Sequence, residues 1–285
     1  MANSVMFFYE NQLGGQLIFG RTSDHILSDI SGMSQVSATV AETQGVGQVG
    51  ATAAGASIQP KTITVNGTVR TAAGRAALLA AVLPGVPAAL AMVDGAKKYI
   101  IEGIPEKSPE VSSNDGPQSF QFALRCSYPY WRGPEARSLL SGLSARFHFP
   151  TSLAGRWYIS RYTSEAFCTV TNPGNIASDL TLQFRARTQV TNPRVYHLES
   201  ESYIQLNTTL DIGDTITVST VYGNKGATHS SQTGSETNAF RLLDIGSNLA
   251  MQLQPGVNTF RVTASAGADG LDVTLIAPKG VWAGV

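Results

Sequence analysis

The stretch DLTLQFRART, residues 179–188, alternates apolar and polar side chains, with Leu180, Leu182 and Phe184 on one side. Period-two alternation places one face of a strand on a core and the other in solvent, which is typical of antiparallel sheets. The same alternation recurs in SQVSATVAE (34–42), KTITVNGTV (61–69), SFQFALRC (119–126), DTITVSTVYG (214–223), NTFRVTA (258–264) and LDVTLIA (271–277). Turn sequences such as TNPGN, DIGD, QPGVN and GADG separate these runs. The sequence therefore predicts a mainly β protein.

One segment departs from this pattern and predicts the single helix of the chain. TAAGRAALLAAVLPG (71–85) is rich in Ala and Leu, begins with a potential N-cap at Thr71 and ends at a Pro-Gly pair. We expect a helix over residues 72–83, with a buried stripe formed by Leu78, Leu79, Val82 and Leu83.

The middle of the chain predicts a domain boundary. Three prolines and several glycines interrupt the strand pattern in SYPYWRGPEARSLLSGLSARFHFPTSLAG (127–155), and the pattern then resumes to the end. We predict an N-terminal β-sandwich-like domain over residues 1–138, with the helix and an extended arm. An antiparallel β-sandwich over residues 139–285 follows.

The charge balance excludes several classes of binding protein. The 285 residues contain 20 Lys plus Arg and 20 Asp plus Glu, so the formal net charge is zero. Proteins that bind nucleic acid or membrane surfaces through charge need a positive field, so we expect neither nucleic-acid specificity nor membrane insertion. Charged residues make up 14% of the chain, below the roughly 25% of ordinary globular proteins. A surface with few charges suits packing against neighbouring proteins, because few charges are desolvated.

A glycine-rich stretch, GVGQVGATAAG (45–55), matches the dinucleotide-binding pattern G-x-G-x-x-G. That pattern needs a helix opening at its last glycine and an acid about twenty residues further on. Gly55 and Pro60 leave no room for the helix, and no Asp or Glu occurs between Glu42 and Asp94. We interpret residues 43–60 instead as an arm that orders against a neighbouring copy. The expected contact residues are Gly45, Val46, Gly47, Gln48, Val49, Gly50, Ala51 and Ile58.

No catalytic, cofactor-binding or metal-binding motif is found in the sequence. The four histidines lack metal-ligand spacing, and we expect His197 to be a surface or hydrogen-bonded imidazole. Glu199 and Glu201 share one strand face and are best explained as solvated positions. Cys126 and Cys168 are expected to be reduced thiols, with a single long-range disulfide as the alternative. We expect a protein that is not an enzyme and that carries no cofactor or metal.

Four segments occur in an order that is similar to a known family. They are KTITVNGTVRTAAGRAALLAAVL, the aromatic corner FALRCSYPYWRG, the turn in AFCTVTNPGN, and an LD-x-x-S pattern that leads to L-x-P-G-x-N. Their succession resembles the distal tail proteins of long-tailed bacteriophages, the siphovirus tail-component family. The positions that carry the resemblance are Tyr128, Pro129, Tyr130, Asn172, Pro173, Gly174, Asp214, Asp244, Pro255, Gly256 and Asn258.

The resemblance implies a structural virion protein at the tail tip, assembled in the host cytoplasm. Such proteins form a ring, usually of six copies, that connects the tail tube to the baseplate or tip adsorption apparatus. The N-terminal domain makes the ring, an arm reaches the next subunit, and a galectin-like C-terminal sandwich points outward. The implied partners are further copies of the chain, the tail tube protein, the tape measure protein, a tail-tip or tail-associated lysin protein, and a receptor-binding protein.

A second hypothesis remains open at this point. The C-terminal β-sandwich could act as a glycan-binding module that contacts the host surface directly. Binding of cell-wall glycan would favour this module, whereas binding to the tube or tip protein alone would favour the ring-forming hub.

Overall fold

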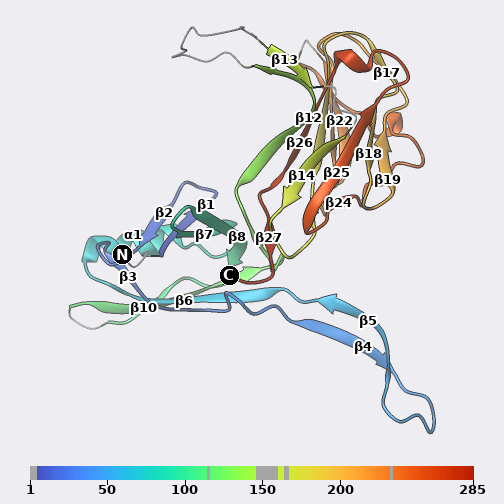
Figure 1. Ribbon diagram of the computed structural model, residues 1–285. Coiled ribbons are helices and arrows are strands. Elements are labelled where there is room, and N and C mark those ends of the chain that lie inside the picture. Colours follow the sequence, from blue (N-terminus) through green and yellow to red (C-terminus); the bar gives the residue numbers. More distant parts are fainter. Residues whose placement is uncertain (1–4, 114–115, 146–159, 164–166, 232–233) are drawn as a thin grey trace. The chain divides into compact units, whose positions relative to one another are not determined.

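The computed structural model describes residues 5–113, 116–145, 160–163, 167–231 and 234–285. Strands dominate, and the described residues contain one α-helix, which confirms the predicted mainly β class (Figure 1). The chain separates into two compact units, residues 1–134 with 282–285, and residues 135–281. The boundary expected after residue 138 falls inside β12 (Glu135–Ala145), the first strand of the second unit. No helix among the described residues is long and apolar enough to cross a membrane.

The first unit is built on one ten-stranded sheet with the order β27-β11-β8-β7-β1-β2-β3-β6-β10-β9. A further pairing of β8 with β10 links strands from the two halves of that order. The predicted sandwich-like arrangement is therefore a single sheet that folds back on itself. The strands are β1 (Met6–Asn11), β2 (Gln16–Phe19), β3 (His25–Ser31), β6 (Lys61–Val69), β7 (Ala88–Asp94), β8 (Lys97–Pro105), β9 (Glu110–Val111), β10 (Gln118–Cys126), β11 (Trp131–Arg132) and β27 (Val281–Trp282).

Aromatic side chains fill the core of this unit. The ring of Phe19 on β2 packs against both Phe120 and Phe122 of β10, with its centroid 6.1 Å from each of theirs. Tyr9 meets Phe122 edge-on at 5.7 Å, and Trp131 is fully buried. Such aromatic pairs contribute about 0.5–1.5 kcal/mol each beyond the area that they bury.

The helix α1 (Ala72–Ala81) begins as predicted and ends earlier than expected. The Thr71 hydroxyl accepts a hydrogen bond from the Gly74 amide at 2.9 Å, so Thr71 is the N-cap. Val82 is the C-cap, which leaves residues 82 and 83 outside the helix. Leu78 and Val82 are buried as predicted, whereas Leu79 is 37% exposed.

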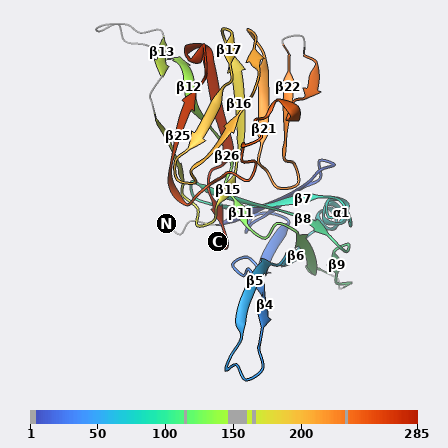
Figure 2. The same ribbon diagram turned by 90° about the vertical axis from the view of Figure 1, so that its right-hand side faces the viewer.

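The second unit is an antiparallel β-sandwich (Figure 2). Phe184, Ile216 and Leu275 of one sheet share a single core with Val195, Ile204 and Phe260 of the other. The first sheet has seven strands: β13 (Ser160–Thr163), β12, β26 (Leu271–Pro278), β16 (Thr181–Ala186), β21 (Thr215–Ser219), β22 (Gly226–Ser230) and β23 (Glu236–Asn238). The second sheet has four: β14 (Cys168–Asn172), β25 (Gly256–Thr263), β18 (Arg194–His197) and β19 (Ser202–Gln205).

Short elements complete the chain. In the second unit these are β15 (Ser178–Asp179) paired with β24 (Gln252–Leu253), β17 (Val190–Thr191) paired with β20 (Thr209–Leu210), and the 3-10 turns η1 (Phe240–Leu242) and η2 (Ala268–Gly270). In the first unit β4 (Ala38–Thr43) pairs only with β5 (Thr52–Ile58). Cys126 and Cys168 form no disulfide, so the alternative of a single long-range bridge is wrong.

Candidate functional site: the hairpin arm

The strands β4 and β5 form an isolated antiparallel hairpin, which we call the arm (Figure 1). Its register runs from Ala38 opposite Ile58 to Thr43 opposite Thr52, with a bulge at Ala41 and Glu42. The predicted arm began at residue 43, so most of its first strand lies outside the predicted bounds. The alternation of SQVSATVAE predicted a strand with one face on a core, but every residue of β4 is exposed.

The glycine-rich stretch forms the tip of the arm. Gly47 and Gly50 have φ angles of 79° and 82°, in the left-handed region that favours glycine. The Gly45 amide donates to the Gln48 side-chain oxygen at 2.9 Å, and the Gln48 amide donates back to the Gly45 carbonyl at 3.1 Å. The three glycines of the G-x-G-x-x-G match therefore turn the chain between antiparallel strands, and no helix follows them.

The arm is exposed on both faces. All residues of β5 are exposed, as are those of β4 and of the tip. Val46 and Val49 at the tip have relative exposures of 111% and 102%, and Val40 and Ile58 are about half exposed at 50% and 49%. Glu42 is the only charged residue from position 34 to position 60. Of the expected contact residues, Gly45 to Ala51 lie together at the exposed tip, whereas Ile58 is exposed at the other end of the hairpin, opposite Ala38.

The root of the arm is held by a buried cluster. The Met33 carbonyl accepts hydrogen bonds from Lys61 Nζ and Trp131 Nε1, both at 2.9 Å. The Lys61 ammonium also lies 5.5 Å from the Trp131 ring centroid, within the range of a cation–π contact. Burial lowers the pKa of Lys61. The sequence pattern did not anticipate this cluster, because Met33 and Trp131 are distant in the sequence.

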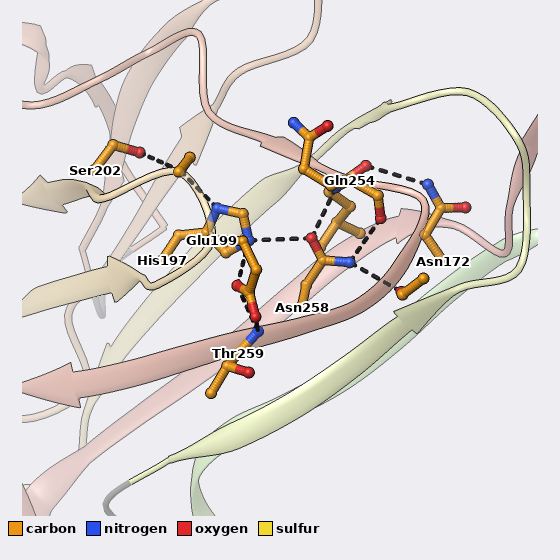
Figure 3. Close-up of polar contacts among 10 residues, drawn as sticks. Asn172, His197, Glu199, Ser202, Gln254, Asn258 and Thr259 are labelled. Carbon is orange, nitrogen blue, oxygen red and sulfur yellow. Dashed lines mark hydrogen bonds and ion pairs between the residues drawn. The ribbon is translucent and has the colours of Figure 1, made fainter.

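The positions that carry the family resemblance in the second unit form turns. The side chains of Asn172 and Asn258 both form hydrogen bonds with the backbone of residues 253–254 (Figure 3). Asn172 Nδ2 donates to the Leu253 carbonyl at 3.1 Å, and Asn258 Oδ1 accepts from the Gln254 amide at 2.7 Å. Both side chains thereby fix the turn that contains Pro255 and Gly256. Gly174 has no room for a Cβ atom, because the Val281 backbone occupies that space.

His197 joins this network as a fully buried imidazole (Figure 3). It is therefore a hydrogen-bonded imidazole and not a surface one, which were the two positions expected from the sequence. Its Nε2 lies 3.1 Å from both Asn258 Oδ1 and Glu199 Oε2, and its Nδ1 lies 2.7 Å from Ser200 Oγ. Two acceptors at Nε2 place the proton there, so Ser200 donates to Nδ1. Burial lowers the pKa of His197, opposed by the Asn258 hydrogen bond and the Glu199 charge. The Glu199 carboxylate also accepts the Thr259 amide at 2.8 Å, so it is bound to the sheet.

The other positions that carry the family resemblance lie outside this hydrogen-bond network. Asp214 Oδ2 accepts the Asp211 amide at 3.2 Å in the turn before β21. Asp244 accepts from Tyr203 Oη and Asn207 Nδ2, both at 2.9 Å. In the first unit the rings of Tyr128 and Tyr130, on either side of the buried Pro129, meet edge-on at 5.3 Å. These residues stabilise local structure, and they do not converge on one site. Within the described ranges, no group of His, Cys, Asp and Glu could hold a metal ion.

Comparisons with known proteins agree with this architecture. Residues 173–275 match the family model of the siphovirus-type tail component, C-terminal domain. The chain is also similar to the Dit protein of phage SPP1, which is described as a paradigm of the hub adsorption apparatus in phages that infect Gram-positive bacteria. The TM-score is 0.66 and the identity 15%, over 96% of this chain and 98% of that chain. A chain of the phage P2 baseplate in its activated conformation with Ca has a TM-score of 0.50 and 11% identity, over 97% and 98%. No curated protein matches the sequence.

Most of the second unit is therefore similar to the siphovirus-type tail component, C-terminal domain. The fold of the SPP1 Dit protein extends over nearly all of the chain. Together, the family match and the shared fold confirm the resemblance to siphovirus distal tail proteins, and they support a structural component of a phage tail or baseplate.

Proposed function

We propose that the chain forms a six-membered ring that connects the phage tail tube to the baseplate or tip adsorption apparatus. The single observation that carries this proposal is the arm, a hairpin with every residue exposed. An isolated two-stranded hairpin is marginally stable in water and gains stability when another surface covers it.

A second copy of the chain is the binding partner that suits the arm best. The arm offers apolar side chains, one charge and two open strand edges, and such edges pair readily with other chains. An arm on one subunit and a different receiving surface on the next make a head-to-tail contact, which closes into a ring when the rotation permits. We assign Gly45 to Ala51 and Ile58 to this subunit contact.

The remaining assignments rest on the relatives. The similar SPP1 protein is described as part of a hub adsorption apparatus, and the similar P2 chain belongs to a baseplate. We therefore assign this chain a place at the virion tail tip after assembly in the host cytoplasm. The first unit would form the ring, and the second, a galectin-like sandwich, would face outward. The tail tube protein, the tape measure protein, a tail-tip or tail-associated lysin protein and a receptor-binding protein would be its neighbours.

The test is the mass and negative-stain image of the purified full chain, alone and with its tail tube protein. We expect rings of six copies, and we expect Val46→Lys with Val49→Lys to abolish them. Ile212→Lys with Ile245→Lys is the matched control, because these residues are 63% and 104% exposed in the second unit.

Two results would count against the proposal. A monomer at all concentrations, with and without the tube protein, would overturn the ring. Rings that persist in the Val46→Lys, Val49→Lys variant would overturn the role of the arm.

A further inference from the structure

The outer face of the four-stranded sheet in the second unit carries a row of aromatic and arginine side chains. Tyr196 of β18 lies opposite Tyr203 of β19 on one side and opposite Arg261 of β25 on the other. Phe167, the residue before β14, extends the row, because the Arg261 guanidinium lies 5.8 Å from its ring centroid. Since neighbouring strands are about 4.8 Å apart, four strands give a row of about 14 Å. We call this surface the Arg–Tyr face.

The Arg–Tyr face is ordered by its own contacts. The Arg194 guanidinium lies 4.3 Å from the Tyr203 ring centroid, and Arg194 Nε donates to Gln205 Oε1 at 2.6 Å. Tyr203 Oη in turn donates to Asp244 Oδ2 at 2.9 Å. On the other side of the same strands, Val195, Ile204 and Phe260 are completely buried. The side chains are thus held on a packed sheet, and they lose little conformational entropy when they bind a ligand.

The charge on this face is positive and only partly compensated. Arg194 and Arg261 are the only charged residues on the outward positions of the four strands, and both are at least partly exposed. Among the described residues, neither arginine makes an ion pair. Asp244 lies at the edge, and its carboxylate already accepts three hydrogen bonds, from Tyr203, Asn207 and Gly246. Guanidinium groups with free N–H donors favour carboxylate and phosphate oxygens.

The face has fewer apolar side chains than the core of a typical protein interface. Such cores are more apolar than the rest of the surface, although Tyr, Phe and Arg are enriched in them. Here the large exposed apolar residues are Phe167 and Val257, at 48% and 59%, and the other outward positions include Thr169, Thr171, Thr259 and Thr263. Hydroxyls, amides and guanidinium donors beside aromatic rings suit a sugar chain, which has C–H groups on its ring faces and oxygens at its edges. The outward positions of β16 and β21 in the other sheet carry Thr, Ser, Gln and Arg without an aromatic ring.

We propose that the Arg–Tyr face binds an anionic polysaccharide, a glycan chain that bears carboxylate or phosphate groups. Arg194 and Arg261 would bind the acidic groups, and Phe167, Tyr196 and Tyr203 would contact the sugar rings. This binding goes beyond the ring-forming role, and it does not require the arm.

The test measures binding of the purified full chain to immobilised polygalacturonate and poly(glycerol phosphate), with neutral dextran and polyglutamate for comparison. We expect binding to the first two polymers and much weaker binding to the others. Arg261→Gln, and Arg194→Gln combined with Arg261→Gln, should weaken binding about tenfold or more, because charged hydrogen bonds are lost. Arg185→Gln is the matched control, since Arg185 is exposed on β16 of the other sheet.

Thermal unfolding and ring formation by the same variants separate this proposal from the ring hypothesis. Ring formation should stay as in the original chain in every variant. Thermal unfolding should be unchanged in Arg261→Gln, whereas the double variant also loses the contacts of Arg194 with Tyr203 and Gln205. Absence of binding to both anionic glycans would overturn the proposal, as would an equal loss in Arg185→Gln. Equally strong binding of polyglutamate would also overturn it and would indicate an acidic protein segment as the ligand.

Discussion

Lys61 and Trp131 donate hydrogen bonds to one acceptor, the carbonyl oxygen of Met33, each over 2.9 Å. Met33 precedes the first strand of the arm and Lys61 follows its second strand. The two ends of the hairpin are therefore joined at a buried point, while the hairpin beyond it has no buried residue. This arrangement gives a stable root to an element that has little stability of its own.

Removing the hydrogen-bond donors at the root of the arm, Lys61 Nζ and Trp131 Nε1, should destabilise the arm. Trp131→Phe deletes a buried N–H donor and leaves a void, so we expect the free energy of unfolding to fall by about 1–3 kcal/mol. Lys61→Met deletes the other donor and should cost about 1 kcal/mol. Hydrogen exchange of the amides in β4 and β5 should accelerate in both variants. Lys97→Met, on an exposed position of β8, is the control, and unchanged exchange in the root variants would contradict the role of this cluster.

Asn258 should be important for the stability of the second unit. Its side chain accepts from the Gln254 amide and donates to the carbonyls of Gln254 and Gly256, at 2.7, 2.8 and 3.1 Å. Asn258→Ala should lower the free energy of unfolding by about 2 kcal/mol, because buried polar groups lose their partners. Calorimetry of the full chain measures this change. Asn224→Ala, in an exposed turn, should have little effect, and similar losses in the two variants would refute the assignment.

His197 should make the stability of the second unit depend on pH. Its pKa in the folded protein lies below the ordinary value of 6.5, so the unfolded chain binds more protons as the pH falls below that value. The stability due to the neutral imidazole is therefore complete above about pH 6.5 and declines below it. His197→Gln should flatten the dependence of the melting temperature between pH 7 and pH 5.

Glu199→Gln is the control for this measurement. It keeps the imidazole, so it should retain the dependence between pH 7 and pH 5. The pKa of Glu199 is lowered, against the effect of burial, by its hydrogen bonds to Thr259 and by His197. The stability that Glu199 contributes is lost only at more acidic pH, as the pH falls below 4.5, the ordinary pKa of this carboxyl group. An unchanged slope in His197→Gln would show that other groups govern the pH dependence.

The two cysteines should differ in reactivity. Burial raises the pKa of Cys126 to about 11, so its thiolate is scarce near pH 8. Cys168 is only partly buried. A maleimide reagent at pH 8 should therefore label Cys168 of the native chain first, and Cys126 only after unfolding. Mass spectrometry of the labelled peptides decides the order, and early labelling of Cys126 would contradict its burial.

Alternation predicted the strands of both cores, but not which alternating strands are buried. Ile63 and Val65 alternate with polar residues in β6 and are fully buried. Ala38 and Val40 show the same period, yet both are exposed in the arm. The period shows that a strand has two chemically different faces. It does not show whether the apolar face is covered by the same chain.

Long-range pairings also lay beyond the sequence pattern. The pairing of β8 with β10 depends on how the whole sheet folds back. The burial of Lys61 at 7% exposure depends on the distant Trp131 and Met33. The predicted turns were more local, so the motifs TNPGN and QPGVN predicted the turns beside Asn172 and Asn258.

The first unit comprises two stretches of the chain, and the second unit is inserted between them. Glu135, where the second unit begins, lies opposite Pro278, three residues before it ends at Val281. Beyond it, Trp282 meets Tyr99 edge-on at 4.9 Å within the first unit. During synthesis on the ribosome, the first unit therefore cannot acquire its Trp282 contact until the whole second unit has been translated. The second unit begins in β12 and ends just after β26, and these two strands are paired. Recombination could therefore replace this unit with another whose ends are equally close, while the sheet of the first unit keeps its own pairing.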